Sequence, residues 1–285
     1  MRIAISGVRG YMSKNLCAEL NKLHHTIIPL ERHILYDKNE LIKRIADTEV
    51  VINLAGAPIL QRWTKTNKSE IYISRIETTK NITNAINNLP DQKKPKLFIS
   101  ASAIGIYTSN LVHTEESELF SSDFVGKVVN DWEKASAELS PAVRKVIFRI
   151  APVIGKEAQI INKILPIFKA GLGGKIGTGK QPFPFIHITD VVNAILWSIQ
   201  NPEAQGIYNL SAPENITNKQ FTRTMSKLIG IPAFFTIPGF VIKLAYGKAA
   251  SLLLESPIVY PQRLINAGFI FIYPDIHTCL NEIIH

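Results

Sequence analysis

The chain has 285 residues, and 46% of them are hydrophobic, which is enough for one large domain or two coupled domains with a substantial core. Its two cysteines, Cys17 and Cys279, lie near opposite ends of the sequence, so neither a disulfide framework nor a metal site is expected. The net charge is +9, but the basic residues occur along the whole chain without a long run or a nucleic-acid motif, so we expect anionic cofactors or substrates and no nucleic acid.

Two apolar stretches have to be compared with a signal peptide and with a membrane span. The N-terminal one lacks the charged, apolar and small-residue regions of a signal peptide and is instead predicted to be a strand. The other, residues 234–254, is interrupted by Pro238, Lys243 and Lys248, which predicts a soluble helix rather than a membrane span. We therefore expect a cytoplasmic protein with no membrane partner.

The first predicted elements are a strand over residues 2–5, a glycine-containing loop and a helix over residues 13–23. In the loop, Gly7 permits a tight turn, and Gly10 allows a pyrophosphate to approach the backbone at the positive end of the helix. This order of strand, loop and helix predicts a dinucleotide site, and a structural turn without a ligand is the alternative. The helix is predicted from apolar residues at spacings of three and four: Met12, Leu16, Leu20 and Leu23.

The elements that follow alternate between strands and helices. Such alternation predicts an α/β protein with a Rossmann-type, doubly wound parallel sheet, whose ligands bind beyond the carboxyl ends of the strands. The further strands are predicted at residues 26–30, 50–54, 96–100 and 146–150, and the helices at 38–46, 66–88 and 127–139.

The composition changes after Gly155, where glycine and proline become frequent. A helix at 189–200 and a strand at 207–211 then precede a helical C-terminal third. We predict a dinucleotide-binding domain over residues 1–155, to which the helix and strand of 188–212 return. The smaller, mostly helical substrate-side region covers 156–285 and includes a terminal module, residues 231–285.

The predicted strands end in small or polar residues that suit a nucleotide site. The third ends in Asn53-Leu54-Ala55-Gly56, where small side chains let a cofactor lie close to the backbone. The fourth ends in Ser100-Ala101-Ser102, which places a hydroxyl beside a nicotinamide or a substrate. The predicted cofactor contacts are Gly7, Arg9, Gly10, Tyr11, Met12, Arg32, Asn53, Leu54, Ala55, Gly56, Ser100, Ala101, Ile150, Ala151 and Pro152.

The charges at the end of the second strand decide which cofactor is expected. A carboxylate there holds the ribose hydroxyls of NAD, whereas an arginine suits the 2′-phosphate of NADP, and this chain has Glu31 followed by Arg32. Arg9 in the loop is a second guanidinium near the same site, and two such groups outweigh one carboxylate that can turn to solvent. NADP(H) is therefore the expected cofactor; the alternative is that both arginines only face solvent.

A set of short motifs extends along essentially the whole chain. They are Asn53-Leu54-Ala55-Gly56 with Arg62-Trp63-Thr64, Ser74-Arg75-Ile76-Glu77, Ser100-Ala101-Ser102-Ala103 with Gly105 and Tyr107, Asp131-Trp132-Glu133, Gly171-Leu172-Gly173-Gly174, His187-Ile188-Thr189-Asp190, and Pro261-Gln262-Arg263-Leu264 with Ala267-Gly268-Phe269. Together they resemble the extended short-chain dehydrogenase/reductase superfamily, and more narrowly the epimerase family proteins of the NAD-dependent epimerase/dehydratase type. The resemblance also implies that the terminal module is one of unknown function typical of that subgroup.

One departure from the superfamily bears on the chemistry. Members that transfer hydride normally use a Tyr-x-x-x-Lys pair, in which the lysine lowers the pKa of a general-base tyrosine. No tyrosine of this chain is followed by a lysine four residues later. The helix that should carry the pair has Phe124 and Val125, and neither side chain exchanges a proton. Any chemistry must therefore use other groups.

The segment 174–181 nearly matches a nucleotide-triphosphate loop. It ends in Gln181 in place of the magnesium-binding Ser or Thr, and Pro182 and Pro184 prevent the helix that must follow. In the resembled family this segment is a substrate-side loop, and members that act on nucleotide sugars often carry an arginine two residues after the glutamine, where this chain has Phe183. A nucleotide-diphosphate sugar is therefore a weaker expectation than the family label suggests. The predicted substrate-binding residues are Trp63, Phe183 and Phe185.

The candidate catalytic residues are Ser102, Tyr107 and His187, and Glu133 is a further group that could face the pocket. A lone histidine at a strand end is more often structural, and a helix-surface or cofactor-ordering role suits Glu133 better. Two functions stay open. The favoured one is an NADP(H)-dependent oxidoreductase or epimerase with a small-molecule substrate, which the retained Ser102 supports. The other is a cofactor-binding regulatory or sensor protein without turnover that recognises a protein partner, which the missing Tyr/Lys pair supports.

Overall fold

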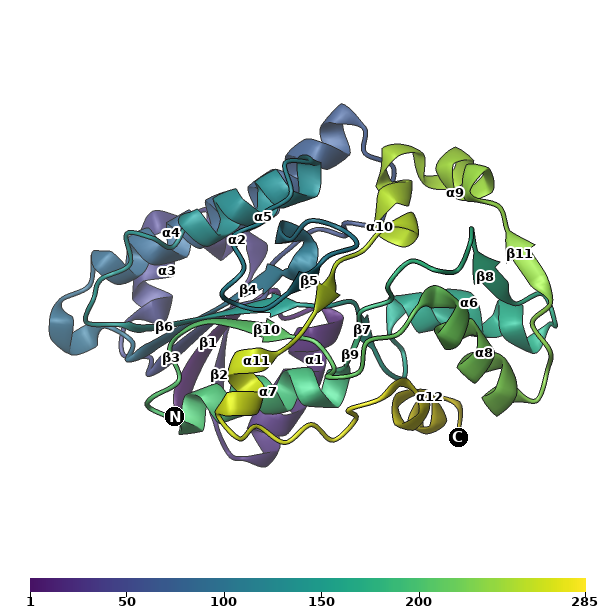
Figure 1. The fold of residues 1–285 in the computed structure, drawn as a ribbon. Helices are drawn as coiled ribbons and strands as arrows, with labels where there is room; N and C mark the ends of the chain where they lie inside the picture. The colour runs from purple at the N-terminus through teal and green to yellow at the C-terminus, as the bar shows by residue number, and fades with distance from the viewer.

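A six-stranded parallel sheet forms the centre of the computed structural model, which describes residues 1–285 (Figure 1). Every pair of neighbouring strands in it runs parallel. The prediction of a Rossmann-type, doubly wound sheet is therefore confirmed. From one edge to the other, the strands are β2 (Thr26–Leu30), β1 (Arg2–Ser6), β3 (Val50–Asn53), β4 (Leu97–Ala103), β6 (Arg144–Ile150) and β10 (Gly206–Leu210).

Helices cover both faces of this sheet (Figure 1). One face carries α1 and α7, which contact each other, and the other carries α3, α4 and α5. Because strand side chains alternate between faces, Ile3 and Ile5 pack in the same core cluster as α1, whereas Ala4 packs in the cluster beside α3 and α4. The bounds of these helices are α1 Tyr11–Lys22, α3 Lys38–Ile45, α4 Lys65–Asn87, α5 Phe124–Lys134 and α7 Ile188–Gln200.

The turn from β1 into α1 depends on Gly7. Its φ is +70°, a conformation that favours glycine. A Cβ at this position would also lie 2.8 Å from the carbonyl oxygen of Leu54, which is closer than such atoms approach. Gly7 is therefore required for the close contact between this turn and the end of β3.

The apolar stripe of α1 is shorter than predicted. Leu16 and Leu20 are fully buried, in agreement with their spacing, but Leu23 is 47% exposed. The helix ends at Lys22, and His24 takes a positive φ of 57°, so the chain turns away from the core at Leu23.

Two other predicted bounds are corrected by the structure. α5 begins at Phe124 rather than at 127, because the Asp123 side chain accepts a hydrogen bond from the N–H of Gly126 and caps the helix. β4 continues to Ala103, because it pairs with β6 as far as that residue. Ser102 therefore lies within the strand and not beyond its end.

A smaller lobe lies to one side of the sheet (Figure 1). It consists of residues 158–185 and 215–254, which we call the C-terminal lobe. Its two short strands, β8 and β11, run parallel, and Phe168, Phe221 and Met225 lie in its core. The elements of the lobe are α6 Gln159–Lys169, β8 Gly174–Ile176, α8 Asn218–Ile229, β11 Phe235–Ile237, α9 Gly239–Tyr246, η3 Gly247–Ala250 and α10 Ser251–Leu254.

The rest of the chain beyond the lobe returns to the sheet and then to the lobe. β12 pairs with β5, α11 packs against β10, and α12 packs against α8. Residues 255–285 of the terminal module thus contact both the sheet and the C-terminal lobe. None of the helices is both long and apolar enough to cross a bilayer. The remaining elements are α2 Arg32–Leu35, η1 Asp91–Lys93, η2 Ile104–Ile106, β5 Val112–His113, β7 Val153–Ile154, β9 Ile186–His187, β12 Ile258–Val259, α11 Gln262–Asn266 and α12 Ile276–Ile284.

Candidate functional site

The N-terminus of α1 is open towards the carboxyl edge of the sheet. Its N-cap, Gly10, offers no side chain, and the first turn contains no acidic residue. The N–H of Lys14 bonds to the Gly10 carbonyl, but the N–H groups of Tyr11, Met12 and Ser13 have no acceptor within the protein. Three free N–H groups at the positive end of a helix attract an anion, and a pyrophosphate suits that position.

Two neighbouring helices that begin at the same edge are closed. α4 follows Thr64 and α5 follows Asp123, and each of these side chains accepts a hydrogen bond from a helix N–H. Among these three helices, only α1 begins without a side-chain cap.

Two arginines lie beside this helix end. Arg9 is in the loop after β1, and Arg32 begins α2 directly after the neighbouring strand β2. Their side chains are 89% and 80% exposed, and their guanidinium groups lie 3.7 Å from Glu31 and 3.8 Å from Glu70. Exposed ion pairs of this length contribute little, so both arginines are free to turn towards a phosphate.

The end of β3 lies at the point where the strand order reverses, the usual position of ligands in such sheets. Asn53 is fully buried there. Its amide oxygen accepts a hydrogen bond from Ser6 Oγ at 2.6 Å, and its amide nitrogen donates to Thr79 Oγ1 at 2.8 Å. The side chain of Asn53 therefore joins β1 to α4 beneath the loop, and a direct contact with a cofactor, as the sequence predicted, is not supported.

The other residues predicted to contact a cofactor follow the same edge. No contact within the protein tests this role for them, so it stays a prediction. Leu54, Ser100, Ala101, Ile150 and Ala151 are buried, Met12 and Ala55 are half-buried, and Gly56 and Pro152 are exposed.

Tyr11, the first residue of α1, connects the loop to the end of the sheet. Its hydroxyl donates a hydrogen bond to the carbonyl oxygen of Lys156 at 2.6 Å. Burial, together with the carboxylates of Glu157 and Glu282, raises the pKa of Tyr11 to about 12. Tyr11 is therefore a neutral hydrogen-bond donor at physiological pH.

A buried chain of polar side chains begins at Ser102. Its hydroxyl donates a hydrogen bond to Glu133 Oε1 on α5 at 2.6 Å. Arg149 on β6 holds the same carboxylate with two bonds, since its Nε and Nη2 each donate to one carboxylate oxygen at 2.8 Å. The exposed fractions are 3% for Ser102 and Arg149 and 12% for the Glu133 side chain. The three groups thus form a charged cluster that is shielded from solvent.

Arg149 remains a cation in this cluster. Burial alone would lower its pKa, but the hydrogen bonds and the negative charge of Glu133 outweigh burial, and the pKa of Arg149 is raised. Its third donor, Nη1, lies 2.8 Å from the Tyr107 hydroxyl oxygen. The ion pair therefore connects Ser102 to Tyr107.

Tyr107 is enclosed in the core and is 2% exposed. Besides Arg149, its hydroxyl contacts Asn209 Oδ1 at 2.8 Å and the carbonyl oxygen of Thr114 at 3.0 Å. Its ring stacks on His113, and burial raises its pKa. A neutral hydroxyl with these partners does not reach a substrate, so direct proton transfer by Tyr107 is not supported and it instead supports Arg149.

The His-x-x-Asp motif fastens the terminal module. His187 is 2% exposed; its Nδ1 accepts a hydrogen bond from the N–H of Thr189, and its Nε2 lies 3.2 Å from Glu282 of α12. Burial lowers the pKa of His187, against the effect of Glu282. The fully buried Asp190 accepts hydrogen bonds from two consecutive N–H groups of the terminal segment, at 2.7 Å and 3.0 Å. These contacts give His187 a structural role, and its catalytic role is not tested and stays a prediction.

An aromatic pair lies where the catalytic tyrosine was expected. Trp63, in the segment after β3, packs edge-on against Phe124 with 5.0 Å between ring centroids, and Lys68 Nζ lies 4.7 Å from the Phe124 centroid. The adjacent Arg62 donates from Nε to the carbonyl oxygen of Ala245 at 3.0 Å. The segment with Trp63 thus bridges to the end of α9 and can form one wall of a substrate site.

The other two predicted substrate residues lie in the core of the C-terminal lobe. Phe183 is half-buried and stacks on Phe221 with 4.2 Å between centroids. Phe185 is 1% exposed and packs in the same core, so nothing within the protein tests its contact with substrate, and that role stays a prediction. In the sequence, nothing distinguishes a phenylalanine of a proline-rich loop that packs in a core from one that lines a pocket.

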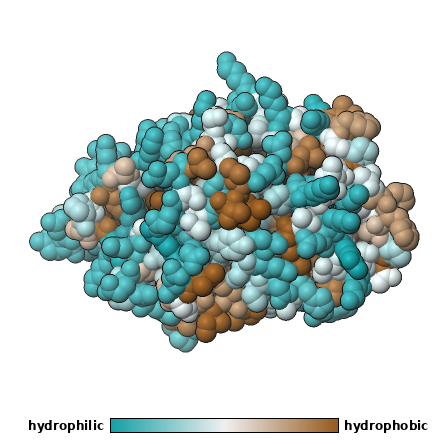
Figure 2. Space-filling view, viewed as in Figure 1, coloured by the Kyte–Doolittle hydropathy of each residue, from teal (hydrophilic) through white to brown (hydrophobic).

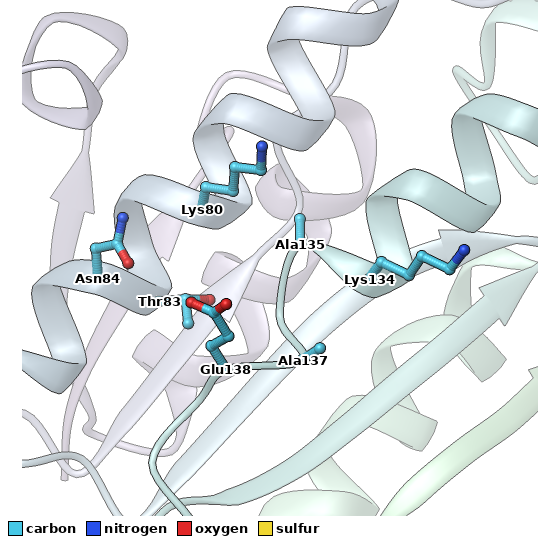
Figure 3. A pocket seen from close by; sticks show the side chains of 7 residues that line it. All are labelled: Lys80, Thr83, Asn84, Lys134, Ala135, Ala137 and Glu138. Carbon is cyan, nitrogen blue, oxygen red and sulfur yellow. The ribbon is translucent and has the colours of Figure 1, made fainter.

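A cavity of about 310 Å³ opens between α4 and the end of α5 (Figure 3). The last turns of α4 lie near the amino ends of the strands, opposite the edge at which α/β sheets bind ligands. The cavity is therefore separate from the candidate site. It is lined by Lys80, Thr83, Asn84, Lys134, Ala135, Ala137 and Glu138.

Sequence reasoning missed the roles of Arg149 and Asn209. Arg149 lies in the buried stretch 146–150 of β6, whose other residues are apolar, and a cation buried there needs a carboxylate partner. That requirement was a usable signal. Asn209 gave none, because a single amide in a strand does not identify its partner.

Comparison with known families supports a whole-chain assignment. The profile of the NAD dependent epimerase/dehydratase family matches residues 3–211, and a domain of unknown function, DUF1731, matches residues 237–283. Epimerase family protein SDR39U1 of Homo sapiens is 30% identical over 295 residues, covering 100% of both chains. Epimerase family protein YfhF of Bacillus subtilis is 30% identical over 300 residues, covering 100% of this chain and 98% of the relative.

Solved structures agree with this assignment. Human epimerase family protein SDR39U1, crystallised with NADPH, has a TM-score of 0.92 to this chain at 29% identity and covers 99% of both chains. A dTDP-4-dehydrorhamnose reductase from Clostridium acetobutylicum shares the fold, with a TM-score of 0.81 at 16% identity, over 100% of this chain and 98% of the other. The chain therefore belongs to the NAD dependent epimerase/dehydratase family.

Proposed function

We propose that the protein is an NADP(H)-dependent oxidoreductase or epimerase that acts on a small molecule. The free N–H groups at the start of α1 and the exposed Arg9 and Arg32 support the cofactor. The crystallisation of human SDR39U1 with NADPH supports it independently, since that relative matches this chain over its whole length. In this proposal the N-terminus of α1 holds the pyrophosphate, and the two arginines hold the 2′-phosphate.

The nicotinamide, when bound, supplies hydride transfer, so the chain itself must move the protons. The single observation that carries this step is the 2.6 Å hydrogen bond from Ser102 to Glu133. During oxidation, the substrate hydroxyl gives its proton to Ser102 Oγ while Ser102 gives its own proton to Glu133. During reduction, both transfers run in the opposite direction. Arg149 fixes the orientation of the carboxylate through its two bonds.

This relay stands in for the Tyr/Lys pair of the superfamily. Phe124 and Val125, at the start of α5, carry no exchangeable proton. General acid–base catalysis contributes about 10²–10⁴-fold to such reactions, so simple aldehydes, ketones and quinones should be reduced very slowly. Faster turnover should require a specific substrate whose oxygen reaches Ser102.

The test combines cofactor binding with turnover. Ser102→Ala should leave NADPH binding unchanged in a calorimetric titration and should reduce turnover of any active substrate by about 10²–10⁴-fold. Ser198→Ala is the matched control, because the hydroxyl of this buried serine bonds only within α7. Brisk turnover that Ser102→Ala does not change would show that the relay is placed wrongly.

A second function is favoured by the burial of Ser102 and Tyr107. Here NADP(H) binding occurs without turnover and orders the terminal module for a protein partner. The terminal module contacts the end of β10, beside the candidate site. Asn209 Nδ2 donates to the carbonyl oxygen of Tyr260, and Ser211 Oγ donates to that of Val259. This second function requires that NADPH protects the terminal module from proteolysis and that no substrate oxidises NADPH. Unchanged proteolysis on saturation with NADPH would exclude it.

A further inference from the structure

The positive charge of the chain is concentrated in the C-terminal lobe. Residues 158–185 and 215–254 contain nine lysines and arginines and no aspartate or glutamate. Outside the lobe the chain has 23 basic and 23 acidic residues, so the lobe accounts for the whole net charge of +9. Basic residues occur along the whole chain, but the excess of basic over acidic residues is confined to the lobe. The nine are Lys163, Lys169, Lys175, Lys180, Lys219, Arg223, Lys227, Lys243 and Lys248, all exposed except the half-buried Lys175.

The same lobe exposes large apolar side chains. Phe234 is 85% exposed just before β11, and Phe240 and Leu244 are 71% and 72% exposed on α9. Leu172, before β8, is also exposed. Phe240 and Leu244 are four residues apart and therefore lie on one side of their helix. Figure 2 shows hydrophobic surface over α9 and β11, at the upper right and along the right edge, next to hydrophilic atoms.

We propose that this surface of the C-terminal lobe docks on an anionic lipid bilayer. The exposed phenylalanine and leucine side chains insert into the interface between headgroups and acyl chains. The lysines that flank them, Lys243 on α9 and Lys248 after it, bind the lipid phosphates. No helix of the protein spans a bilayer, so the attachment is peripheral. The proposal does not depend on the function proposed above.

The charge and the side-chain types decide against other occupants. A second copy of the lobe would place cations against cations, because the lobe contains no acidic residue that could face them. A nucleic acid could stack on Phe234 or Phe240, but the exposed Leu172 and Leu244 offer no ring to stack on. Aliphatic and aromatic side chains that project among lysines are the composition that a lipid interface accepts.

The test is flotation of the full-length protein with vesicles. We expect binding to vesicles of phosphatidylcholine and phosphatidylglycerol and none to vesicles of phosphatidylcholine alone. Phe240→Ser should weaken binding about tenfold, since burial of one aromatic side chain is worth about one order of magnitude in affinity. Ile270→Ser is the matched control, because Ile270 is 78% exposed and lies outside the lobe. Thermal melts of the variants show that each still folds.

Charge reversal tests the lysines of this surface separately from its apolar side chains. Lys243→Glu with Lys248→Glu should weaken vesicle binding at least tenfold, and Lys38→Glu with Lys96→Glu, outside the lobe, should not. Absence of flotation with the anionic vesicles would overturn the proposal, as would equal losses in Phe240→Ser and Ile270→Ser. If charge reversal abolishes binding but Phe240→Ser leaves it unchanged, the lobe is attracted to the anionic headgroups without inserting its apolar side chains, and that result would also overturn the proposed docking.

Discussion

Replacement of Arg149 by methionine should destabilise the fold more than any surface change. Arg149 makes two bonds to Glu133 and one to Tyr107 and is 3% exposed. Arg149→Met leaves a carboxylate that is 12% exposed with Ser102 as its remaining donor. Leaving one charge of a buried pair without its partner costs about 3–5 kcal/mol, a large fraction of the roughly 5–15 kcal/mol by which domains are stable.

Removing both charges should cost far less than removing one. In Glu133→Leu with Arg149→Met, no buried charge lacks a partner, and the Tyr107 hydroxyl keeps Asn209 as a neighbour. We expect the double variant to recover all but about 1–2 kcal/mol of the stability lost by Arg149→Met, since apolar replacements of buried ion pairs are often neutral.

Urea unfolding, followed by tryptophan fluorescence to which Trp132 next to Glu133 in α5 contributes, measures these differences. Arg44→Met is the control, because Arg44 pairs with Glu40 on an exposed helix face and should leave the urea midpoint nearly unchanged. A loss below about 1 kcal/mol for Arg149→Met, or a double variant as unstable as the single one, would refute the reasoning.

Three further predictions concern the cofactor site and the terminal module. Gly10→Leu should abolish NADPH binding in a thermal-shift titration yet still fold, since φ at Gly10 is −72° and the one atom near an added Cβ is the Gly7 carbonyl oxygen at 3.1 Å; normal binding would reduce the loop to a structural turn. Arg32→Ala should remove most of the preference for NADPH over NADH, about tenfold or more by calorimetry, because a charged contact to phosphate is worth roughly 1.5–3 kcal/mol; equal affinities in the unmodified protein would contradict the assignment. Because burial lowers the pKa of His187, the unfolded state binds more protons, so stability should fall as the pH drops below about 6.5. His187→Asn should flatten that part of the curve of urea midpoint against pH, and an unchanged curve would assign the effect elsewhere.

The sequence predicted the sheet because its signals are local and repeated. Apolar strands alternate with helices, and Gly7 marks a turn whose positive φ excludes most other residues. The bounds of α5 were harder to predict than its existence. The helix was expected over 127–139 but spans Phe124–Lys134, and its start is set by the Asp123 cap, which apolar spacing does not reveal. Leu23 was predicted on the buried face of α1 from its apolar spacing, but the helix ends at Lys22 and Leu23 is exposed.

The candidate site was only partly predictable because it joins residues far apart in the chain. Ser102 was predicted from its strand end, but its partner Glu133 comes from α5 and the cation from β6. A pattern of spacing within one element does not show which side chains meet across elements. His187 and Phe185 were hard to assign for a related reason: a strand end and an aromatic loop occur equally at a pocket and at a packed interface, and both side chains are buried in this structure.

The terminal module connects to both halves of the candidate site. On the cofactor side, Glu282 of α12 contacts His187 and lies 3.5 Å from Lys156 Nζ, and the carbonyl oxygen of Lys156 accepts the hydroxyl of Tyr11 at the start of α1.

On the other side, the carbonyl oxygen of Tyr260 accepts a hydrogen bond from Asn209, which contacts Tyr107 and through it Arg149 and Glu133. A displacement of the module would therefore disturb the Ser102–Glu133 pair through consecutive hydrogen bonds, and the phosphate loop through the ion pair between Glu282 and Lys156. Since these contacts are buried on the relay side, the module and the site should unfold together rather than as separate units. What residues 255–285 of the module do should accordingly be sought in how they set the geometry of this site.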